Sequence, residues 1–413
     1  MNLPSPMSDQ CRFCSGSISS FMSFGSMPRA SGFLDQTQFD SENFFELKPA
    51  LCCECKLFQI IDVPQASTIF HDSYPHLTSS SKVVVQHFRK LSQLVAEQYL
   101  RNSSAFLVEI GSNDGSLLEP ILELGIRHLG VEPATDIANI AVEKGINTLV
   151  KFFGTDTALE IRKAYGPADV IIGANVIAHI PDINGLVNGV RTLLKEDGVF
   201  IFEAVYLGDL VRNTSYSQIY DEHVFNFSIE SVQNIFRRHD LELFDAEKID
   251  LQGGSMRYFL TPIGSKIISS RVTELLEEEL KTGLNEVQTM DQFRKRCETS
   301  RENIINLVES IRGSGNRIAG YGAATKSTII LNYTGLDTDS LDFIVDSTSA
   351  KQGKYSPGMH IPIKSPEYFR NHYPDYTIIF PWNHFDEITR KEREYRNCGG
   401  QWILPLLSPE VRH

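Results

Sequence analysis

The chain has 413 residues, which is too long for one ordinary hydrophobic core, so we expect two or three domains. Hydrophobic residues make up 41% of it, and no apolar run approaches the roughly 18 residues of a membrane span, so we expect a soluble protein with no membrane partner. The net charge of -13 argues against a nucleic-acid partner, because proteins that bind nucleic acids gather Lys and Arg on one face. The amino terminus lacks the features of a secretory signal, which predicts a cytoplasmic location with reduced or metal-bound cysteines.

Two C-x-x-C pairs near the amino terminus carry the first specific signal. Four thiolates suit tetrahedral zinc, and a metal can stabilise a segment that is too small to bury its own core. Because protein ligands would fill all four positions, we expect structural Zn²⁺ in a domain spanning residues 1–80. Cys53 could replace Cys52, but the two-residue spacing favours Cys52. The expected ligands are Cys11, Cys14, Cys52 and Cys55.

A serine run followed by an amphipathic pattern predicts a helix over residues 82–100. This helix leads into "AFLVEIGSNDGSLLEP", which predicts a strand over residues 106–110, a glycine turn and a second helix. Gly111 and Gly115 allow a sharp turn and a close approach of the backbone to a ligand. Their G-x-x-x-G spacing differs from the G-x-G-x-x-G turn that binds a dinucleotide pyrophosphate.

An acidic residue, Glu132, follows the second predicted strand, 132 − 111 = 21 positions after the first glycine. A carboxylate there can accept both hydroxyl protons of a ribose, and ribose recognition without a pyrophosphate turn indicates S-adenosylmethionine. The segments "ADVIIGANVIAHI" and "LLKEDGVFIFEAVY" continue the pattern, which predicts a Rossmann-like domain over residues 81–250. The expected cofactor-binding residues are Glu109, Gly111, Asn113, Asp114, Gly115, Glu132, Pro133 and Asn175.

The last third of the chain begins with a long charged helical stretch and continues into "NRIAGYGAATKSTIILNY", a strand, glycine turn and helix. Thr325 stands where a dinucleotide fingerprint would have its third glycine, whereas the amides of the helix start and Lys326 suit a diphosphate. A nicotinamide site, a sugar-nucleotide site and a repeat without ligand remain alternatives. We expect a second Rossmann-like domain over residues 251–413. Its expected substrate-binding residues are Gly322, Ala323, Thr325, Lys326, Asp346, Lys351, Lys354, Trp382 and Asn383.

The motifs "VEIGSNDG", "GVEP", "NVIAHIPD", "YDEHVFNFS", "GGSMRY" and "GYGAATKS", with the two cysteine pairs, resemble the three-domain sugar C-methyltransferases over essentially the whole chain. Members of that family alkylate nucleotide-linked 4-keto-deoxysugars. One departure is Gln252, where the family usually has a histidine before the "GGS" turn. The resemblance implies an α/β protein with a zinc-binding domain and two Rossmann-like domains. It also implies methyl transfer to C3 of an NDP-4-keto-6-deoxyhexose, dTDP-linked, held between the last two domains. Methylation at C5 or of another ketone, and an NAD(P)-dependent oxidoreductase, are the alternatives.

The stretch "YDEH" (residues 220–223) contains the candidate catalytic residues for this reaction. Such a polar cluster by itself could also be a solvated loop. Methylating a carbon next to a ketone requires a base of near-neutral pKa, and histidine suits that task. We expect His223 to remove the proton, Glu222 to orient His223 or tune its basicity, and Tyr220 to hydrogen-bond the enolate oxygen or relay a proton. Whether Tyr220 or His223 is the base stays open.

Two further residues are assigned to the sugar by the resemblance alone. These are His179 in the "AHIPD" loop and Tyr74 near the serine run, although neighbouring His71 and His76 could take the place of Tyr74. No segment is typical of a coiled coil, and we expect a monomer.

Overall fold

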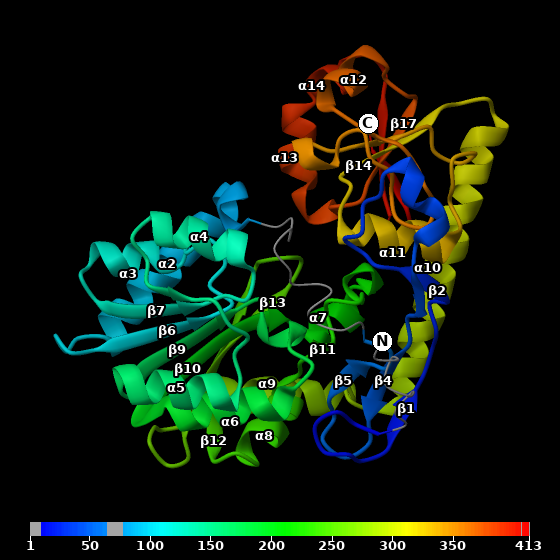
Figure 1. The fold of residues 1–413 in the computed structure, drawn as a ribbon. Helices are drawn as coiled ribbons and strands as arrows, with labels where there is room; N and C mark the ends of the chain where they lie inside the picture. Colours follow the sequence, from blue (N-terminus) through cyan, green and yellow to red (C-terminus); the bar gives the residue numbers. More distant parts are fainter. Residues whose placement is uncertain (1–9, 64–76, 406, 413) are drawn as a thin grey trace.

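The computed structural model describes residues 10–63, 77–405 and 407–412. Within these residues the strands form sheets of four, seven and six strands and one two-stranded ribbon. Figure 1 shows the sheets following one another along the chain, from the amino-terminal strands (blue) through the central sheet (cyan to green) to the carboxy-terminal sheet (orange and red). This is the predicted architecture of an amino-terminal domain and two Rossmann-like domains.

The four-stranded sheet is antiparallel and takes its last strand from a distant part of the chain. Its order is β1 (Ile18–Ser20), β4 (Pro49–Cys52), β5 (Phe58–Ile60) and β11 (Phe225–Asn226). β2 (Ser26–Pro28) and β3 (Phe44–Glu46) form the separate ribbon. Because β11 follows the "YDEH" stretch directly, the amino-terminal domain holds the end of that loop.

The seven-stranded sheet has the order β12-β13-β10-β9-β6-β7-β8. Its strands are β6 (Phe106–Ile110), β7 (Arg127–Val131), β8 (Thr148–Leu149), β9 (Ala168–Ala174), β10 (Leu194–Val205), β12 (Leu241–Ile249) and β13 (Ser255–Pro262). Strands β6 to β10 are parallel, and β13 is antiparallel to both of its neighbours. The chain moves from β6 to β7 and β8 and then returns to β9, so a crevice opens where β6 and β9 end.

The predicted domain boundary at residue 250 falls between two hydrogen-bonded strands of this sheet. β13 pairs with β10 and β12 along most of its length, so the central sheet extends to Pro262. The sequence pattern does not reveal this, because an antiparallel hairpin after the last helix leaves no composition change at residue 250.

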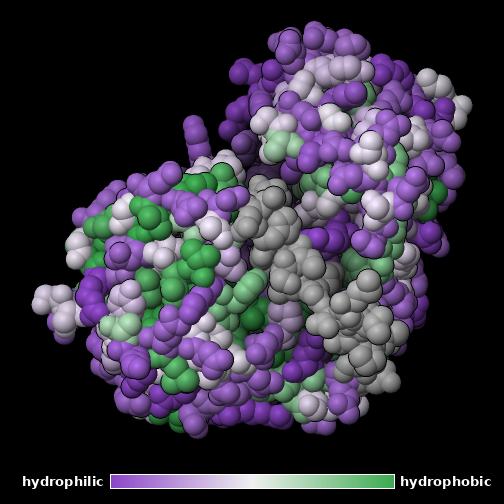
Figure 2. All heavy atoms as spheres, in the orientation of Figure 1, coloured by the Kyte–Doolittle hydropathy of each residue, from purple (hydrophilic) through white to green (hydrophobic). Residues whose placement is uncertain are grey.

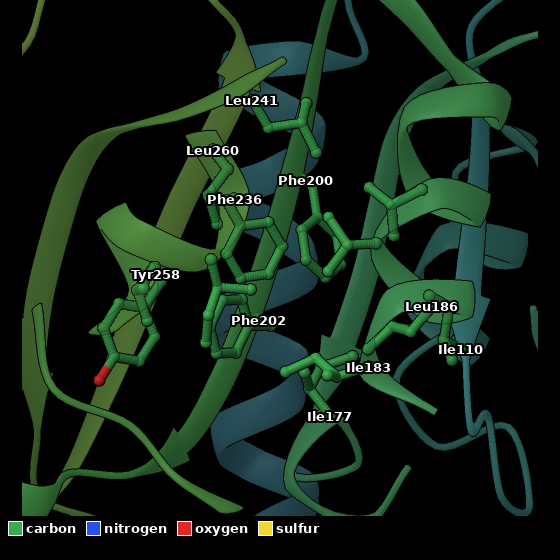
Figure 3. Packing of buried hydrophobic residues seen from close by; sticks show 14 of the residues in the cluster. Ile110, Ile177, Ile183, Leu186, Phe200, Phe202, Phe236, Leu241, Tyr258 and Leu260 are labelled. Atoms are coloured by element: carbon green, nitrogen blue, oxygen red, sulfur yellow. The ribbon is translucent and has the colours of Figure 1, made fainter. Parts of the chain in front are cut away.

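Helices cover both faces of the central sheet. They are α2 (Lys82–Tyr99), α3 (Glu119–Glu123), α4 (Thr135–Glu143), α5 (Thr155–Tyr165), α6 (Ile183–Leu193), α8 (Ile229–Arg237) and α9 (Ser270–Thr282), whereas α7 (Leu207–Arg212) packs in the core of the terminal domains. Side chains alternate along β6, with Leu107 packed on α2 and Val108 on the opposite face. That opposite face contains the aromatic cluster of Phe200, Phe202 and Phe236 (Figure 3). The predicted helix over 82–100 corresponds to α2, whose first turn is capped by the Ser81 hydroxyl.

The six-stranded sheet is parallel except for its last strand, in the order β16-β15-β14-β17-β18-β19. Its strands are β14 (Ile318–Tyr321), β15 (Ile344–Val345), β16 (Ile363–Lys364), β17 (Tyr376–Ile379), β18 (Gln401–Leu404) and β19 (Glu410–Arg412). Its helices are α10 (Val287–Gly313), α11 (Thr325–Thr334), α12 (Pro366–Asn371), α13 (Phe385–Lys391) and α14 (Arg393–Asn397). The long helix α10 runs beside the amino-terminal strands (Figure 1), where Phe293 packs on Phe21. The amino- and carboxy-terminal domains therefore share one core.

None of the helices that the structure describes is both long enough and apolar enough to span a membrane. Hydrophilic residues occupy most of the face in Figure 2, and the apolar residues among them are dispersed mainly over the central domain. Dispersed apolar side chains are normal on the surface of a globular protein and indicate no particular partner.

Candidate active site

The four predicted zinc ligands lie together. Their sulfur atoms are all within 4.8 Å of one another, with 3.6 Å between Cys11 and Cys55 and 3.4 Å between Cys14 and Cys52. A tetrahedral zinc ion with Zn–S bonds of about 2.3 Å places its sulfurs about 3.8 Å apart, so the cluster fits the metal. Cys53 is exposed and outside the cluster, in agreement with the two-residue spacing.

A cavity of about 640 Å³ lies at the carboxyl ends of the central parallel strands. It brings together residues that the sequence assigned to three different tasks. The cofactor-binding predictions that line it are Glu109, Gly111, Asn113, Glu132, Pro133 and Asn175, the catalytic ones are His179, Tyr220, Glu222 and His223, and the substrate-binding one is Thr325. Tyr74, with His71 and His76, lies outside the described residues.

The turn after β6 has the predicted glycine geometry. Gly111 has φ +65°, and a Cβ there would come within 2.5 Å of Val176 Cγ2; Gly115 has φ +78°, and its Cβ would meet Ile146 Cδ1 at 2.3 Å. Asp114 is buried and accepts hydrogen bonds from the Ser79 amide (2.9 Å) and the Ser116 hydroxyl (2.6 Å). Gly115 and Asp114, predicted to bind the cofactor, do not line the cavity. They belong to the turn after β6 and stabilise its conformation.

Unpaired acceptors line the cofactor end of the cavity. Among the described residues, Glu109 Oε2 and Asn175 Oδ1 are buried without a hydrogen-bond partner. Burial raises the pKa of Glu109 well above its usual value, and the neighbouring Glu132 and Asp114 carboxylates act in the same direction. Buried acceptors without a partner require a donor or a cation, so this end of the cavity fits the ammonium and sulfonium groups of S-adenosylmethionine.

Glu132 connects the loops after β6 and β7. One carboxylate oxygen accepts the Asn113 amide at 2.9 Å and the other accepts the Ala134 amide at 3.0 Å. Each carboxylate oxygen can accept a second hydrogen bond, so this cavity-lining group keeps the capacity to bind a diol.

At the other end, Tyr220 and His223 form a hydrogen-bonded pair. The Tyr220 hydroxyl lies 2.8 Å from His223 Nε2, and His223 Nδ1 lies 2.8 Å from the Gln218 carbonyl oxygen. A carbonyl only accepts, so Nδ1 carries the proton, and the tyrosine hydroxyl donates to Nε2. Burial lowers the pKa of His223 to about 4, and Lys326 adds to this, so the imidazole is neutral at pH 7. Burial, with the Glu222 charge, raises the pKa of Tyr220 well above its usual value.

Two more cavity residues surround this pair. The His179 ring lies 5.1 Å from the His223 ring, centroid to centroid. Gln252 lies at the tip of the β12–β13 hairpin with φ +55°, a left-handed conformation that glutamine rarely adopts. The departure from the family histidine therefore faces the site itself.

Most residues predicted to bind substrate in the carboxy-terminal domain form a separate group. Lys326 Nζ donates to Asn383 Oδ1 at 2.9 Å and lies 5.3 Å from the centre of the Trp382 ring. Lys351, predicted in an open loop, is buried; it donates to the Ala323 carbonyl at 2.8 Å and lies 3.8 Å from Asp346. The residues predicted to bind substrate that do not line the cavity are Gly322, Ala323, Lys326, Asp346, Lys351, Lys354, Trp382 and Asn383.

Several cavity residues were not predicted. Phe152 and Phe153 follow β8 and line the cofactor end, as do Ser112 and Phe88. The two phenylalanines follow the carboxyl end of a parallel strand. Ligands of such sheets bind at these strand ends, so the position could have identified both residues. Ser112 and Phe88 carried no distinguishing signal in the sequence.

Three family models match the chain in succession. They are described as a zinc binding domain (residues 11–70), a methyltransferase domain (85–246) and a C-methyltransferase C-terminal domain (250–406). C-methyltransferase NovU of Streptomyces niveus is 36% identical over 406 residues, which are 98% of this chain and 96% of NovU. Ubiquinone biosynthesis O-methyltransferase of Bartonella tribocorum is 30% identical over 94 residues, 22% of this chain and 38% of that protein. A solved S-adenosylmethionine-dependent methyltransferase of Anabaena variabilis aligns with 45% of this chain and 85% of its own length, with 16% identity and a TM-score of 0.35.

The match to NovU covers nearly the whole chain and therefore extends through all three domains. The cofactors are S-adenosylmethionine and zinc, and the activity is C-methylation. The chain belongs to the three-domain, S-adenosylmethionine-dependent sugar C-methyltransferase family.

Proposed function

We propose that this enzyme methylates C3 of an NDP-4-keto-6-deoxyhexose, dTDP-linked, through an enolate. The observation that carries the proposal is the Tyr220–His223 pair, which lines the same cavity as Glu109 and Glu132. A base next to a cofactor site is what carbon methylation α to a ketone needs, because the carbanion equivalent must form within reach of the methyl donor.

The cofactor end of the cavity binds and orients the methyl donor. S-adenosylmethionine, when bound, supplies an electrophilic methyl group. Glu109 and Asn175 accept from its cationic portion, and Glu132 accepts from its ribose hydroxyls. The enclosing side chains exclude water, which matters because water would reprotonate an enolate.

The proton leaves the sugar carbon through the tyrosine–histidine pair. Tyr220 takes the proton at its oxygen while passing its own hydroxyl proton to His223 Nε2, so the imidazole ends as imidazolium and the phenol is unchanged. His223 can accept the proton because its Nε2 is unprotonated at pH 7, although burial makes it a weaker base than an exposed imidazole; the raised pKa of Tyr220 makes tyrosinate a rare species. The Nδ1–H bond to the Gln218 carbonyl keeps Nε2 directed at Tyr220.

We assign the nucleotide diphosphate of the substrate to a binding place at the first turn of α11. Thr325 lines the same cavity as Tyr220, and the next residue is Lys326. Burial lowers the pKa of Lys326 to about 8, and a diphosphate beside it would favour the charged ammonium. All three domains of one chain build this region, so we propose that the enzyme acts as a monomer.

Deuterium exchange at the sugar ring tests the proposed reaction. The enzyme is incubated in D₂O with S-adenosylhomocysteine and a dTDP-4-keto-6-deoxyhexose, and the ring protons are followed by NMR. We expect loss of the C3 proton signal at a rate far above that of an enzyme-free control. Exchange confined to C5 would move the methylated position there, and no exchange at either carbon would exclude this substrate.

The assignment of Glu132 to the ribose predicts a loss of cofactor affinity in Glu132→Gln. The amide replaces one acceptor oxygen with a donor, so one ribose hydrogen bond is lost and one backbone amide is left opposite an NH₂ group. We expect the Kd for S-adenosylhomocysteine to rise at least about tenfold in calorimetric titration. Glu123→Gln, at an exposed carboxylate on α3, is the control. Equal affinities of both variants would contradict the assignment.

A further inference from the structure

The "YDEH" loop is held by two residues of the amino-terminal domain, Ala30 and Ser31. The Ser31 hydroxyl donates to Glu222 Oε1 at 2.6 Å, and the Ala30 amide donates to Asp221 Oδ1 at 3.2 Å. Glu222, which lines the cavity, is 4% exposed, and Asp221 is 1% exposed. Adjacent buried carboxylates need donors, and 191 positions separate each donor from its acceptor. The two contacts are therefore long-range interactions that form only in the assembled three-domain protein.

The same short segment also contacts the carboxy-terminal domain. Thr328 of α11 donates its hydroxyl to the Ala30 carbonyl at 2.9 Å, and Ala30 is fully buried. Thr325, one turn earlier on α11, lines the same cavity as Tyr220. Helix α11 therefore holds the segment through Ala30, so the backbone at Ser31 has little freedom to move away from Glu222.

We propose that Ser31 is a positioning residue for methyl transfer, which holds the Glu222 carboxylate in its place beside Tyr220 and His223. The inference rests on the proposed role of that loop in proton removal. A hydroxyl-to-carboxylate hydrogen bond of 2.6 Å is charge-assisted and directional, so it fixes one rotamer of Glu222. Without it the carboxylate loses this short hydrogen bond, and the charge beside the Tyr220–His223 pair is held less firmly.

The test compares Ser31→Ala with Ser31→Thr, which keeps the hydroxyl, and with Ser20→Ala. Ser20 is a matched control, because it is a serine of the same domain whose hydroxyl, within the described part of the chain, donates to the backbone carbonyls of Met22 and Pro49. We expect Ser31→Ala to lower kcat about tenfold with KM for the sugar and Kd for S-adenosylhomocysteine within about twofold. Ser31→Thr should recover most of kcat, and Ser20→Ala should match the wild type. In a Glu222→Gln background, Ser31→Ala should add less than a twofold effect, because the two residues act as one unit.

A second readout does not depend on the sugar. Hydrogen–deuterium exchange of the peptide over residues 220–228, measured by mass spectrometry in the presence of S-adenosylhomocysteine, should be several-fold faster in Ser31→Ala than in Ser20→Ala. Wild-type kcat and equal loop exchange in the two alanine variants would overturn the proposal. So would a loss of activity that Ser31→Thr does not recover. Failure of the wild-type enzyme to exchange C3 would overturn the proposed substrate instead, and the loop measurement would still decide the role of Ser31.

Discussion

Replacing His223 with asparagine is expected to reduce methyl transfer by about a thousandfold while S-adenosylhomocysteine binds within about twofold of the wild type. Asparagine can still donate to the Gln218 carbonyl, as Nδ1 does now at 2.8 Å, but at neutral pH it has no atom that accepts a proton. General-base catalysis contributes about 10² to 10⁴ to enzymatic rates, and the loss should appear in kcat. Single-turnover methyl transfer at saturating substrate is the direct measurement.

Two further variants show whether the effect belongs to the pair. Tyr220→Phe keeps the ring beside His223 and removes the relay oxygen, so we expect a loss of about a hundredfold. His239→Asn is the matched control, because His239 bonds Asn184 and Asn188 and does not line the cavity. Wild-type turnover in His223→Asn would exclude His223 as the proton acceptor. A loss of cofactor binding along with activity would assign it a structural role.

His223→Asn should also change how the stability of the protein depends on pH. Burial lowers the pKa of His223 from 6.5 to about 4, so between these values the unfolded chain takes up a proton that the folded protein does not. The wild type should therefore lose stability as pH falls from about 6.5 to 4, by roughly 3 kcal/mol from this group alone. Asparagine does not titrate, and urea unfolding across this range should show a shallower acid loss in the variant.

Local patterns in the sequence were sufficient for the features that depend on near neighbours. Cys11 and Cys14 can be assigned to zinc because a C-x-x-C pair is local, and the second pair completes four ligands. Gly111 and Gly115 have positive φ because the strand must turn within a few residues. The strand at 106–110 and the start of the helix at Lys82 follow from hydrophobic periodicity and a serine cap.

Features that depend on distant segments could not be predicted in this way. Ser31 lies 191 positions from Glu222, and nothing near Ser31 indicates a carboxylate partner. Lys351 was expected to bind the substrate, but within the fold its ammonium group lies beside Asp346 and donates to the Ala323 carbonyl. The pairing of β13 with β10 could not be predicted, because the paired residues lie fifty to sixty positions apart in the chain. Each of these requires knowledge of which segments the fold brings together.

Removing zinc is expected to abolish methyl transfer even though none of the four cysteines lines the cavity. The connection is Gln59 on β5, whose side-chain amide donates to Cys11 Sγ at 3.3 Å and accepts from the Arg12 amide at 3.1 Å. Gln59 is also paired with Phe225 on β11, and the Ile60 amide donates to the Val224 carbonyl at 3.0 Å. Val224 is the residue after His223, so β5, which contacts the cysteine cluster through Gln59, holds the end of the "YDEH" loop.

This arrangement predicts that catalysis and cofactor binding separate when the metal is lost. Metal binding supplies much of the folding free energy of small zinc domains, so β5 should loosen without it and release β11. The seven-stranded sheet contains no strand from the zinc domain, and S-adenosylhomocysteine should still bind within a fewfold. We therefore expect Cys11→Ser to lose zinc, to unfold at a lower temperature and to fall at least about a hundredfold in kcat. Cys53→Ser, at an exposed cysteine outside the cluster, should behave as the wild type. The two variants are compared by zinc content, thermal unfolding, calorimetry and methyl transfer. A zinc-free enzyme with normal turnover would show that the β5–β11 pairing holds the loop without the metal.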